Sequence, residues 1–416
     1  MLDRIIFCNS RDMIKSVNVA QLKPGMYIHD LNCGWMEHPF ALNQFKIASP
    51  DQIKNIAAAG LHEVYIDTAK GLDVADAKTV EEVKKQLDAK LVEIATKKPE
   101  PAHIHSIAEE MVKAKKAYSD ANRIITGMMQ DIRLGKQIET EQAAQVVEQM
   151  TNSIFRNKDA MLSLTRLRSK DDYTFQHSVS VCTLLVSFAR AMELDRDTIR
   201  EIGVGALLHD VGKMKVPDAV LNKPGKLTDD EFKIMKSHVV HSRLLLENTP
   251  GMTRIGIDVA AQHHERFDGS GYPLGLKHDG ISLYGQMAAI VDVYDAITAD
   301  RCYHKGMETS VALRKLVEWS KFHFNEKLVH SFVRSVGIYP VGTLVKLESE
   351  KLGIVFEQHE KNLLTPKIHV IYDSKRMSFI TPHDIDLSKP VGNGGGDKIA
   401  GYEDPAKWNI DPLKYL

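Results

Sequence analysis

The feature that most constrains the fold is a long region, residues 162–336, in which almost every segment has the apolar periodicity of a helix. Loops that contain glycine and proline separate these segments. After the sequence GIYPVG the pattern changes abruptly to short runs rich in β-branched residues: TLVKLES, KLGIVFEQ, KIHVIYD and MSFIT. The sequence therefore predicts an all-α core followed by a small β extension.

The segments that precede this core indicate a mixed module and then long helices. Residues 16–70 combine strand-like alternation, a Pro-Gly turn and a short helical pattern, which predicts a small α+β module. Further on, apolar residues recur with spacings of 4, 3, 4, 3, 4, 3 and 4, at Ile107, Met111, Ala114, Tyr118, Ala121, Ile125, Met128 and Ile132. Two structures explain this heptad seam: the buried stripe of an intramolecular hairpin, or a self-association helix that forms a homodimer.

Composition and charge exclude several classes of protein. The 54 basic residues balance the 55 acidic ones, so the overall charge gives no indication of DNA binding or of binding to an anionic membrane. No apolar run approaches the roughly 18 residues that span a bilayer, and the N-terminus lacks the features of a signal peptide. The four cysteines form no CxxC pair. We therefore expect a cytoplasmic protein without membrane insertion.

Five fragments of the helical region carry the residues of a candidate metal site. Taken alone, most of these residues have an ordinary explanation, because a single histidine on an amphipathic helix is usually solvated or hydrogen-bonded. Asp292 differs, since it lies inside the apolar run MAAIVDVY, where a carboxylate is costly unless it is paired or bound to a metal. The candidate ligands are five histidines and two acids: His177, His209, Asp210, His238, His263, His264 and Asp292.

The residue types in this set indicate the metal and the chemistry. Imidazoles and carboxylates without a cysteine favour iron or manganese over a four-ligand structural zinc. Neighbouring residues on a helix diverge by about 100°, so His263 and His264 need not bind the same ion, which predicts two divalent metal ions. Such a pair suits in-line attack on a phosphodiester. Lys213, one turn beyond His209, is placed to contact a phosphate oxygen.

The sequences HDVGK, HH and DGSGYP together resemble the HD-GYP family, the branch of the HD superfamily that hydrolyses cyclic di-GMP. The resemblance covers residues 165–336, and it implies that the seven residues above are metal ligands, with Asp210 and Lys213 catalytic. It also implies that Lys213 and the loop of Gly271, Tyr272 and Pro273 lie at the substrate, and that this loop can meet GGDEF-domain proteins. The segment VNVAQLKPGMYI is similar to a domain of unknown function that often precedes HD-GYP.

Two departures from the family pattern affect what the resemblance implies. Some members place a glutamate one turn before the first histidine and bind a third metal; here that position is Tyr173, with Asp172 beside it, which favours two metals. The segment DRCYHKG keeps Arg301 and Lys305, which in the family hold the nucleotide, but Cys302 replaces a proline and His304 takes a basic position. We therefore expect the affinity for the nucleotide, or the preference among nucleotides, to differ from the family norm.

These observations lead to a function and a domain plan. We expect hydrolysis of cyclic di-GMP to linear pGpG, with GMP as a further product left open. The alternatives are hydrolysis of 3',3'-cyclic GMP-AMP and a non-catalytic nucleotide sensor. The expected domains are an α+β module, a helical linker, the HD-GYP domain, a β extension, and a linker with a tail that docks through Trp408, Leu413 and Leu416. Their ranges are 1–75, 76–160, 161–337, 338–387 and 388–416.

Overall fold

The structure is a computed structural model of the 416-residue chain. It describes residues 13–34, 40, 42–96, 104–166, 173–299, 306–359, 362–391 and 394–415. The chain forms two compact units, one of Met1–Lys90 with Asn222–Lys233, the other of Leu91–Leu221 with Ile234–Leu416. Within the described ranges, no helix is both long enough and apolar enough to cross a membrane.

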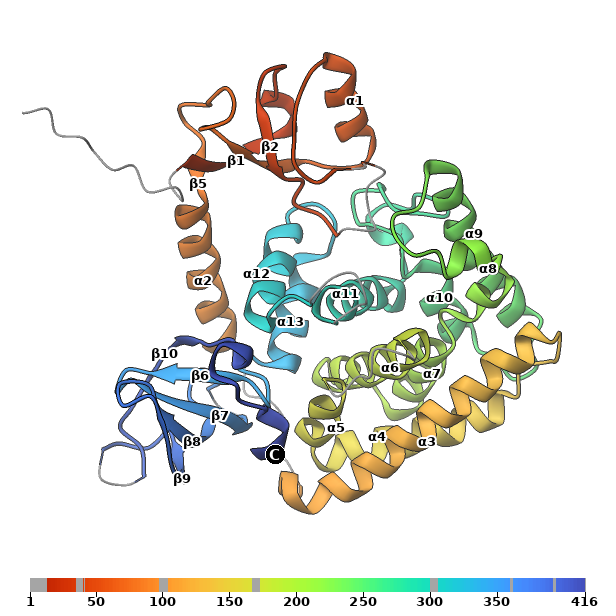
Figure 1. The fold of residues 1–416 in the computed structure, drawn as a ribbon. Helices are drawn as coiled ribbons and strands as arrows, with labels where there is room; N and C mark the ends of the chain where they lie inside the picture. The colour runs from red at the N-terminus through yellow and green to blue at the C-terminus, as the bar shows by residue number, and fades with distance from the viewer. Residues whose placement is uncertain are drawn as a thin grey trace, which may run out of the picture. The chain divides into compact units, whose positions relative to one another are not determined.

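The first unit is built on an antiparallel sheet with the strand order β3-β2-β4-β1-β5 (Figure 1). Its elements are β1 (Ile14–Asn18), η2 (Val19–Gln21), β2 (Tyr27–Asp30), β3 (Phe45–Lys46), α1 (Pro50–Ala58), β4 (Glu63–Asp67) and β5 (Lys78–Thr79). Ile28, Ile56 and Ile66 are fully buried between the sheet and α1. The α+β module predicted from the alternating strand patterns is confirmed.

A segment from much later in the chain completes this first unit. Residues Asn222–Lys233 belong to it, although they connect two helices of the helical core. Lys226 Nζ donates to Phe40 O and to Asn43 Oδ1, both at 3.1 Å. Lys223 and Glu231 pair at 2.6 Å within the segment. Nothing in the local sequence pattern predicts this association, because it depends on contacts between residues far apart in the chain.

The second unit contains the helical core. Its helices up to residue 221 are α3 (Ile107–Arg133), α4 (Thr140–Arg156), α5 (Lys158–Leu164), α6 (Tyr173–Ala191), α7 (Arg196–Leu207), η3 (Val211–Lys215) and α8 (Asp218–Leu221). The later ones are α9 (Asp229–Glu247), α10 (Arg254–Gln262), η4 (His278–Gly280), α11 (Leu283–Thr298), α12 (Thr309–Trp319) and α13 (Glu326–Val336). Two helices have residues in both units: α2 (Val80–Thr96) and α9. The predicted all-α core is confirmed.

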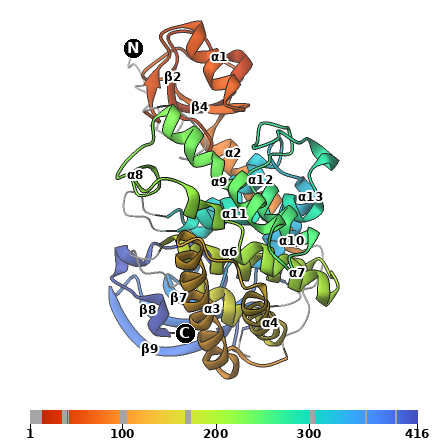
Figure 2. The same ribbon diagram turned by 90° about the vertical axis from the view of Figure 1, so that its right-hand side faces the viewer.

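Helix α6 forms the centre of this core. It packs against α3, α4, α5, α7, α11 and α13 (Figure 2). Its residues from His177 to Ala189 are all buried, as expected for a helix that is apolar on most of its surface. A polar ligand carried by α6 is therefore held inside the protein by packing on every side.

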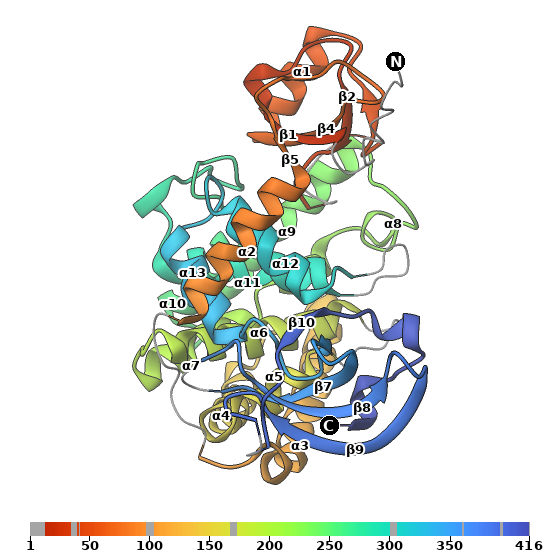
Figure 3. The ribbon, with the colours of Figure 1, turned by 90° about the vertical axis from the view of Figure 1, so that its left-hand side faces the viewer.

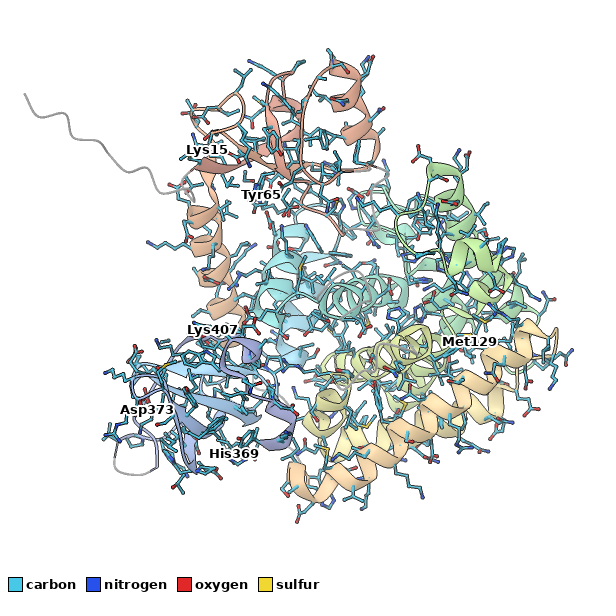
Figure 4. The ribbon with its side chains drawn as sticks, in the orientation of Figure 1. Lys15, Tyr65, Met129, His369, Asp373 and Lys407 are labelled. Carbon is cyan, nitrogen blue, oxygen red and sulfur yellow. The ribbon has the colours of Figure 1, made fainter. Side chains whose placement is uncertain are left out.

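The heptad seam of α3 is buried inside the same chain. From Met111 to Ile132 the seam residues are at most 8% exposed, and α3 packs against α4, α5 and α6. Tyr118 Oη lies 3.1 Å from Ser180 Oγ of α6, and Met129 on the same helix is fully buried (Figure 4). The intramolecular hairpin therefore accounts for the seam, and the self-association helix does not.

The β extension is a second antiparallel sheet with the order β10-β6-β7-β8-β9. Its strands are β6 (Leu344–Leu347), β7 (Lys351–Glu357), β8 (Lys367–Asp373), β9 (Ser378–Asp386) and β10 (Ile399–Tyr402). Figure 3 shows that β8 and β9 curve strongly, and their register shifts at an irregularity between Val370 and Tyr372. Strand β10 lies in the segment predicted as a linker, where a Gly-rich run precedes a strand too short to show alternation.

The C-terminal tail and several buried polar groups secure this sheet. Trp408 of η5 (Pro405–Trp408), Ile410 and Tyr415 of η6 (Pro412–Tyr415) pack against one face of the sheet, whereas the Leu413 side chain and Leu416 lie outside the described parts. Directly after β7, Gln358 connects the sheet to the helical core. Its N–H donates to Asp159 Oδ2 at 3.2 Å, and its Nε2 atom donates to Val336 O at 2.7 Å. The sheet is thus bonded to α5 and to the end of α13.

Candidate metal centre

The close approach of two helices brings two of the predicted ligands together. A Cβ atom added to Gly205 of α7 would lie 2.6 Å from the Cα atom of Gly256 of α10, so the crossing requires glycine. Helix α7 ends at Leu207 and α10 at Gln262, directly before the histidines. As a result, the rings of His209 and His263 have centroids 4.8 Å apart.

A third glycine holds the His-Asp turn against α9. A Cβ atom on Gly212 would lie 2.0 Å from His238 O, and the Gly212 N–H donates to Ser242 Oγ at 2.9 Å. His238 is carried by α9 and Asp210 precedes η3. The backbone of the turn at Gly212 therefore packs directly against the backbone of α9, and this contact places His238 beside Asp210.

Asp210 lies between two groups of imidazoles. Its Oδ2 atom is 3.3 Å from His209 Nε2 and 3.7 Å from His177 Nε2. Its Oδ1 atom is 3.3 Å from His238 Nε2 and 4.0 Å from His263 Nε2. Each carboxylate oxygen thus faces a different pair of nitrogen atoms.

Asp292 of α11 also faces these imidazoles. Its Oδ1 atom lies 3.0 Å from His177 Nε2 and 3.8 Å from His209 Nε2, and its Oδ2 atom lies 3.8 Å from His264 Nδ1. All seven predicted ligands are therefore brought together. Three overlapping groups have donor atoms within 4.8 Å of one another: His177, His209 and Asp292; His209, Asp210 and His263; and His238, His263 and His264.

Hydrogen bonds to backbone carbonyls define the tautomers of three histidines. His209, His238 and His263 place Nδ1 at 2.7, 2.7 and 2.8 Å from the carbonyl oxygens three residues earlier. Because a carbonyl oxygen only accepts, each Nδ1 carries the hydrogen and each Nε2 presents a lone pair.

Those lone pairs have no hydrogen-bond partner. Nε2 of His209, His238 and His263, together with Asp210 Oδ1, are buried without a hydrogen bond. A buried polar atom without a hydrogen bond lowers the free energy of unfolding by about 1–3 kcal/mol. Four such atoms lie close together here. Acceptor atoms that converge on a shared space are what a cation requires, so the residues fit a metal centre.

The buried setting keeps the donor atoms in the state that binds metal. Burial lowers the pKa of His238 to about 4 and that of His263 to about 3, and it lowers the pKa of His264 well below the ordinary value. These imidazoles are therefore neutral at pH 7. His177 differs: burial on its own lowers its pKa, but hydrogen bonds to Asp292 and Asp295 outweigh that effect and raise it.

The two acids stay ionised in spite of their burial. Burial on its own raises the pKa of Asp210, but the Lys213 ammonium and the nearby imidazoles outweigh it and hold that pKa well below the ordinary value. The pKa of Asp292 is also well below its ordinary value, because the hydrogen bond from His177 and the other imidazoles outweigh burial. The site thus combines two carboxylates with the neutral imidazoles of His238, His263 and His264.

Lys213 and the Gly-Tyr-Pro loop lie at the edge of this centre. Lys213 Nζ is 2.5 Å from Asp210 Oδ2, and its side chain is 20% exposed. The Tyr272 ring stacks on the His264 ring at 4.7 Å between centroids, and Lys236 Nζ lies 4.8 Å from the Tyr272 centroid. A Cβ atom on Gly271 would lie 2.3 Å from Arg266 N, so the loop passes this point only with glycine.

Two acids that the sequence did not single out support the site. Both oxygens of buried Glu265 accept backbone N–H groups of the loop, from Leu274 at 2.8 Å and from Leu276 at 2.9 Å. Asp295 Oδ2 lies 2.6 Å from His177 Nδ1. Two sequence signals could have identified these acids. Glu265 directly follows the histidine pair, and Asp295 lies three residues after Asp292 in an apolar helix.

Some predicted residues cannot be placed. Arg301, Lys305 and Asp172 lie outside the described residues, as do Cys302 and His304. Tyr173 begins α6, but its side chain is not among the described parts.

Two family matches cover most of the chain. Residues 14–143 match a domain of unknown function, DUF3391, and residues 148–328 match the family described as HD domain. The second match contains the seven candidate ligands and the Gly-Tyr-Pro loop.

Several curated proteins are similar in sequence. The cyclic di-GMP phosphodiesterase PA4108 of Pseudomonas aeruginosa is 40% identical over 402 residues, which cover 96% of this chain and 95% of that protein. A cyclic di-GMP phosphodiesterase of Thermotoga maritima is 36% identical over 40% of this chain and 45% of its own. The 3'3'-cGAMP-specific phosphodiesterase 1 of Vibrio cholerae is 37% identical over 36% of this chain and 34% of its own.

Among solved structures, Bd1817, an HDG"Y"P protein from Bdellovibrio bacteriovorus, matches with a TM-score of 0.46 and 17% identity. The match covers 77% of this chain and 98% of that one.

Proposed function

The chain belongs to the HD-GYP family of HD-domain proteins, and from that premise we propose that it is a metal-dependent phosphodiesterase that hydrolyses cyclic di-GMP. The product is linear pGpG, and whether a second cut yields GMP is decided by the assay below. The Pseudomonas relative, which aligns along nearly its whole length, carries the name of this activity.

The position of Asp210 between two groups of imidazoles is the observation that supports this function best. In the proposed centre, His177, His209 and Asp292 would hold one divalent ion and His238, His263 and His264 would hold a second, while the Asp210 carboxylate faces both groups. Nitrogen and oxygen donors without sulfur support iron or manganese. When bound, such a pair supplies an activated water and screens the charge of a phosphodiester.

The chain's own residues perform the remaining tasks. Lys213 reaches the site as a partly exposed cation and is proposed to bind a phosphate oxygen. Glu265 fixes the end of the loop of Gly271, Tyr272 and Pro273 by accepting the N–H groups of Leu274 and Leu276, which follow it. Arg301 and Lys305 are proposed to bind the nucleotide, on the family resemblance alone.

A second candidate substrate is 3',3'-cyclic GMP-AMP. It presents the same phosphates with one different base, and the Vibrio relative is named for it. The segment DRCYHKG, which departs from the family pattern, is where base preference is expected to differ. A non-catalytic sensor is the other alternative, and it is less well supported because all seven ligand residues are present.

Further proposals concern partners, location and domain roles. GGDEF-domain proteins are proposed partners of the Gly-Tyr-Pro loop, and the cytoplasm is the proposed location. A homodimer was predicted from the α3 seam alone, and the burial of that seam within one chain removes this argument for it. Catalysis is assigned to residues 161–337, with 1–75 as a separate module, 76–160 as a helical connection, and 338–387 and 388–416 as C-terminal additions.

The test is turnover of each nucleotide by protein purified with its iron or manganese retained. Chromatography should show cyclic di-GMP converted to pGpG, with slower conversion of 3',3'-cyclic GMP-AMP. Faster conversion of the mixed nucleotide would transfer the assignment to that substrate. Tight binding without conversion of either, by fully metal-loaded protein, would establish the sensor instead.

A further inference from the structure

The hydrogen-bond partner at Nδ1 differs among four of the candidate histidine ligands. His209, His238 and His263 are backed by backbone carbonyl oxygens. His177 is backed by a carboxylate, with Nδ1 at 2.6 Å from Asp295 Oδ2. Both side chains are buried, at 4% and 1% exposure, so water screens this pair little.

The same helix supplies both acids on this side of the centre. Asp292 and Asp295 are three residues apart on α11, so they lie on the same face of the helix. His177 lies between them, with Nε2 at 3.0 Å from Asp292 Oδ1 and Nδ1 directed at Asp295. The imidazole is thus fixed at both nitrogen atoms.

The two groups of donors therefore differ in charge. The group of His177, His209 and Asp292 contains a carboxylate and has a second one, Asp295, directly behind it. The group of His238, His263 and His264 consists of imidazoles alone. Asp210 faces both groups and does not distinguish them.

We propose that the two cation positions of the centre are unequal, and that Asp295 is the positioning residue that makes the position beside His177 bind its ion more tightly. This inference rests on the proposed function for its ligand set. A carboxylate behind a histidine ligand orients the ring and makes the ligating nitrogen more basic. A backbone carbonyl orients the ring as well, but it contributes no net charge.

The consequence is an order of filling. Manganese added to metal-free protein should occupy the position at His177 first and the position at His238 second. Replacing the partner behind a ligating histidine weakens metal binding by roughly 10- to 100-fold. Replacing Asp295 should therefore weaken the binding of the first ion and leave the affinity for the second ion unchanged.

The test is a titration of metal-free protein with Mn²⁺, with free Mn²⁺ followed by electron paramagnetic resonance. Wild type should show two binding steps of different affinity. Asp295→Asn keeps an oxygen that can accept the His177 N–H but removes the charge, and it should weaken the tighter step by about 10- to 100-fold. The looser step should be unchanged. Asp218→Asn, which neutralises an exposed acid paired with Arg133, is the control and should leave both steps unchanged.

A second measurement keeps the inference testable if Asp295→Asn fails to fold. Crystals of metal-free wild type soaked with one equivalent of Mn²⁺ should show anomalous density beside His177 and little beside His238. Density of equal strength at both positions would overturn the inference, as would equal weakening of both steps in Asp295→Asn. Failure of the proposed function would look different. In that case wild-type protein would bind Mn²⁺ at two unequal sites but would not hydrolyse the nucleotide.

Discussion

Asp210 and His238 meet without a hydrogen bond: Oδ1 of the acid lies 3.3 Å from Nε2 of the imidazole, and both atoms are buried. The Nδ1–H of His238 already donates to Met235 O, so Nε2 presents its lone pair to a carboxylate oxygen. Two acceptors at this distance repel each other unless a cation lies between them. This relationship is the structural reason for assigning metal to the centre.

Replacing Asp210 should therefore remove metal and activity together. Asp210→Ala deletes the carboxylate that faces both imidazole groups, and it removes charge from the site without leaving a large cavity. We expect a folded protein with well under two ions per chain and no measurable hydrolysis. Elemental analysis and a turnover assay measure both. Asp218→Ala, at an exposed acid paired with Arg133, is the control, and full metal loading in Asp210→Ala would contradict the assignment.

Lys213→Ala should separate metal binding from catalysis. The ammonium is assigned to the substrate phosphate and not to the ions, so the metal content should stay at the wild-type level. Loss of a charge contact made in the transition state lowers turnover by about 10²–10³-fold. Lys215→Ala, at an exposed lysine two residues further on, should have wild-type turnover. Loss of metal in Lys213→Ala would show that the lysine has a structural role.

The glycine crossing of α7 and α10 should be essential for stability. A Cβ atom on Gly205 would meet backbone atoms of Gly256 at 2.6 Å, so Gly205→Ala forces the helices apart and should cost about 1–3 kcal/mol or more of unfolding free energy. Gly127 of α3 is the matched control, since a Cβ atom there meets nothing within 4 Å. Gly127→Ala should stabilise by roughly 0.5–1 kcal/mol. Urea unfolding measures both, and equal effects would contradict the packing.

The buried pair of Glu110 and Arg156 should make stability depend on pH. Arg156 Nε donates to Glu110 Oε2 at 2.6 Å, and Ser153 Oγ donates to Oε1 at 2.8 Å. Burial on its own raises the pKa of Glu110, but these hydrogen bonds outweigh it and lower that pKa. With the folded-state pKa below the unfolded one, the stabilisation is present above the unfolded value of about 4.3 and is lost as the pH falls through the folded value.

Glu110→Gln should therefore lower stability at pH 7 by about 3 kcal/mol, the lower end of the range for breaking a buried pair, because Arg156 is partly exposed. The difference between wild type and variant should shrink as the pH falls below about 4. Urea midpoints at several pH values test this, and a difference that grows on acidification would have the wrong sign.

The sequence predicted the helical core, and it singled out the seven candidate ligands that the structure brings together, because both inferences depend on residue types and local periodicity. Asp292 stood out as a carboxylate in an apolar run, and the structure places it among the histidines. The seam of α3 was ambiguous, since a heptad pattern requires a partner but does not identify it. Only the packing of Tyr118 and its neighbours on α4, α5 and α6 identifies that partner.

Other features depend on contacts between residues far apart in the chain. Asp295 acts through His177, which lies 118 residues earlier in the chain, and no short motif encodes that distance. Lys226 joins the first unit through contacts with Phe40 and Asn43, equally remote in sequence. Strand β10 depends on pairing with β6 across a Gly-rich segment. Each is a property of tertiary contacts and not of local pattern.

The measurement that tests the central claim most directly is a crystal structure of iron- or manganese-loaded protein, with anomalous data collected at the edge of the bound metal. Two peaks should appear, one among His177, His209 and Asp292 and one among His238, His263 and His264, with Asp210 in contact with both. Tyr173 in place of a glutamate predicts that there is no third peak. Three peaks would contradict the dinuclear centre, and loaded protein with no peak at these residues would contradict the metal site itself.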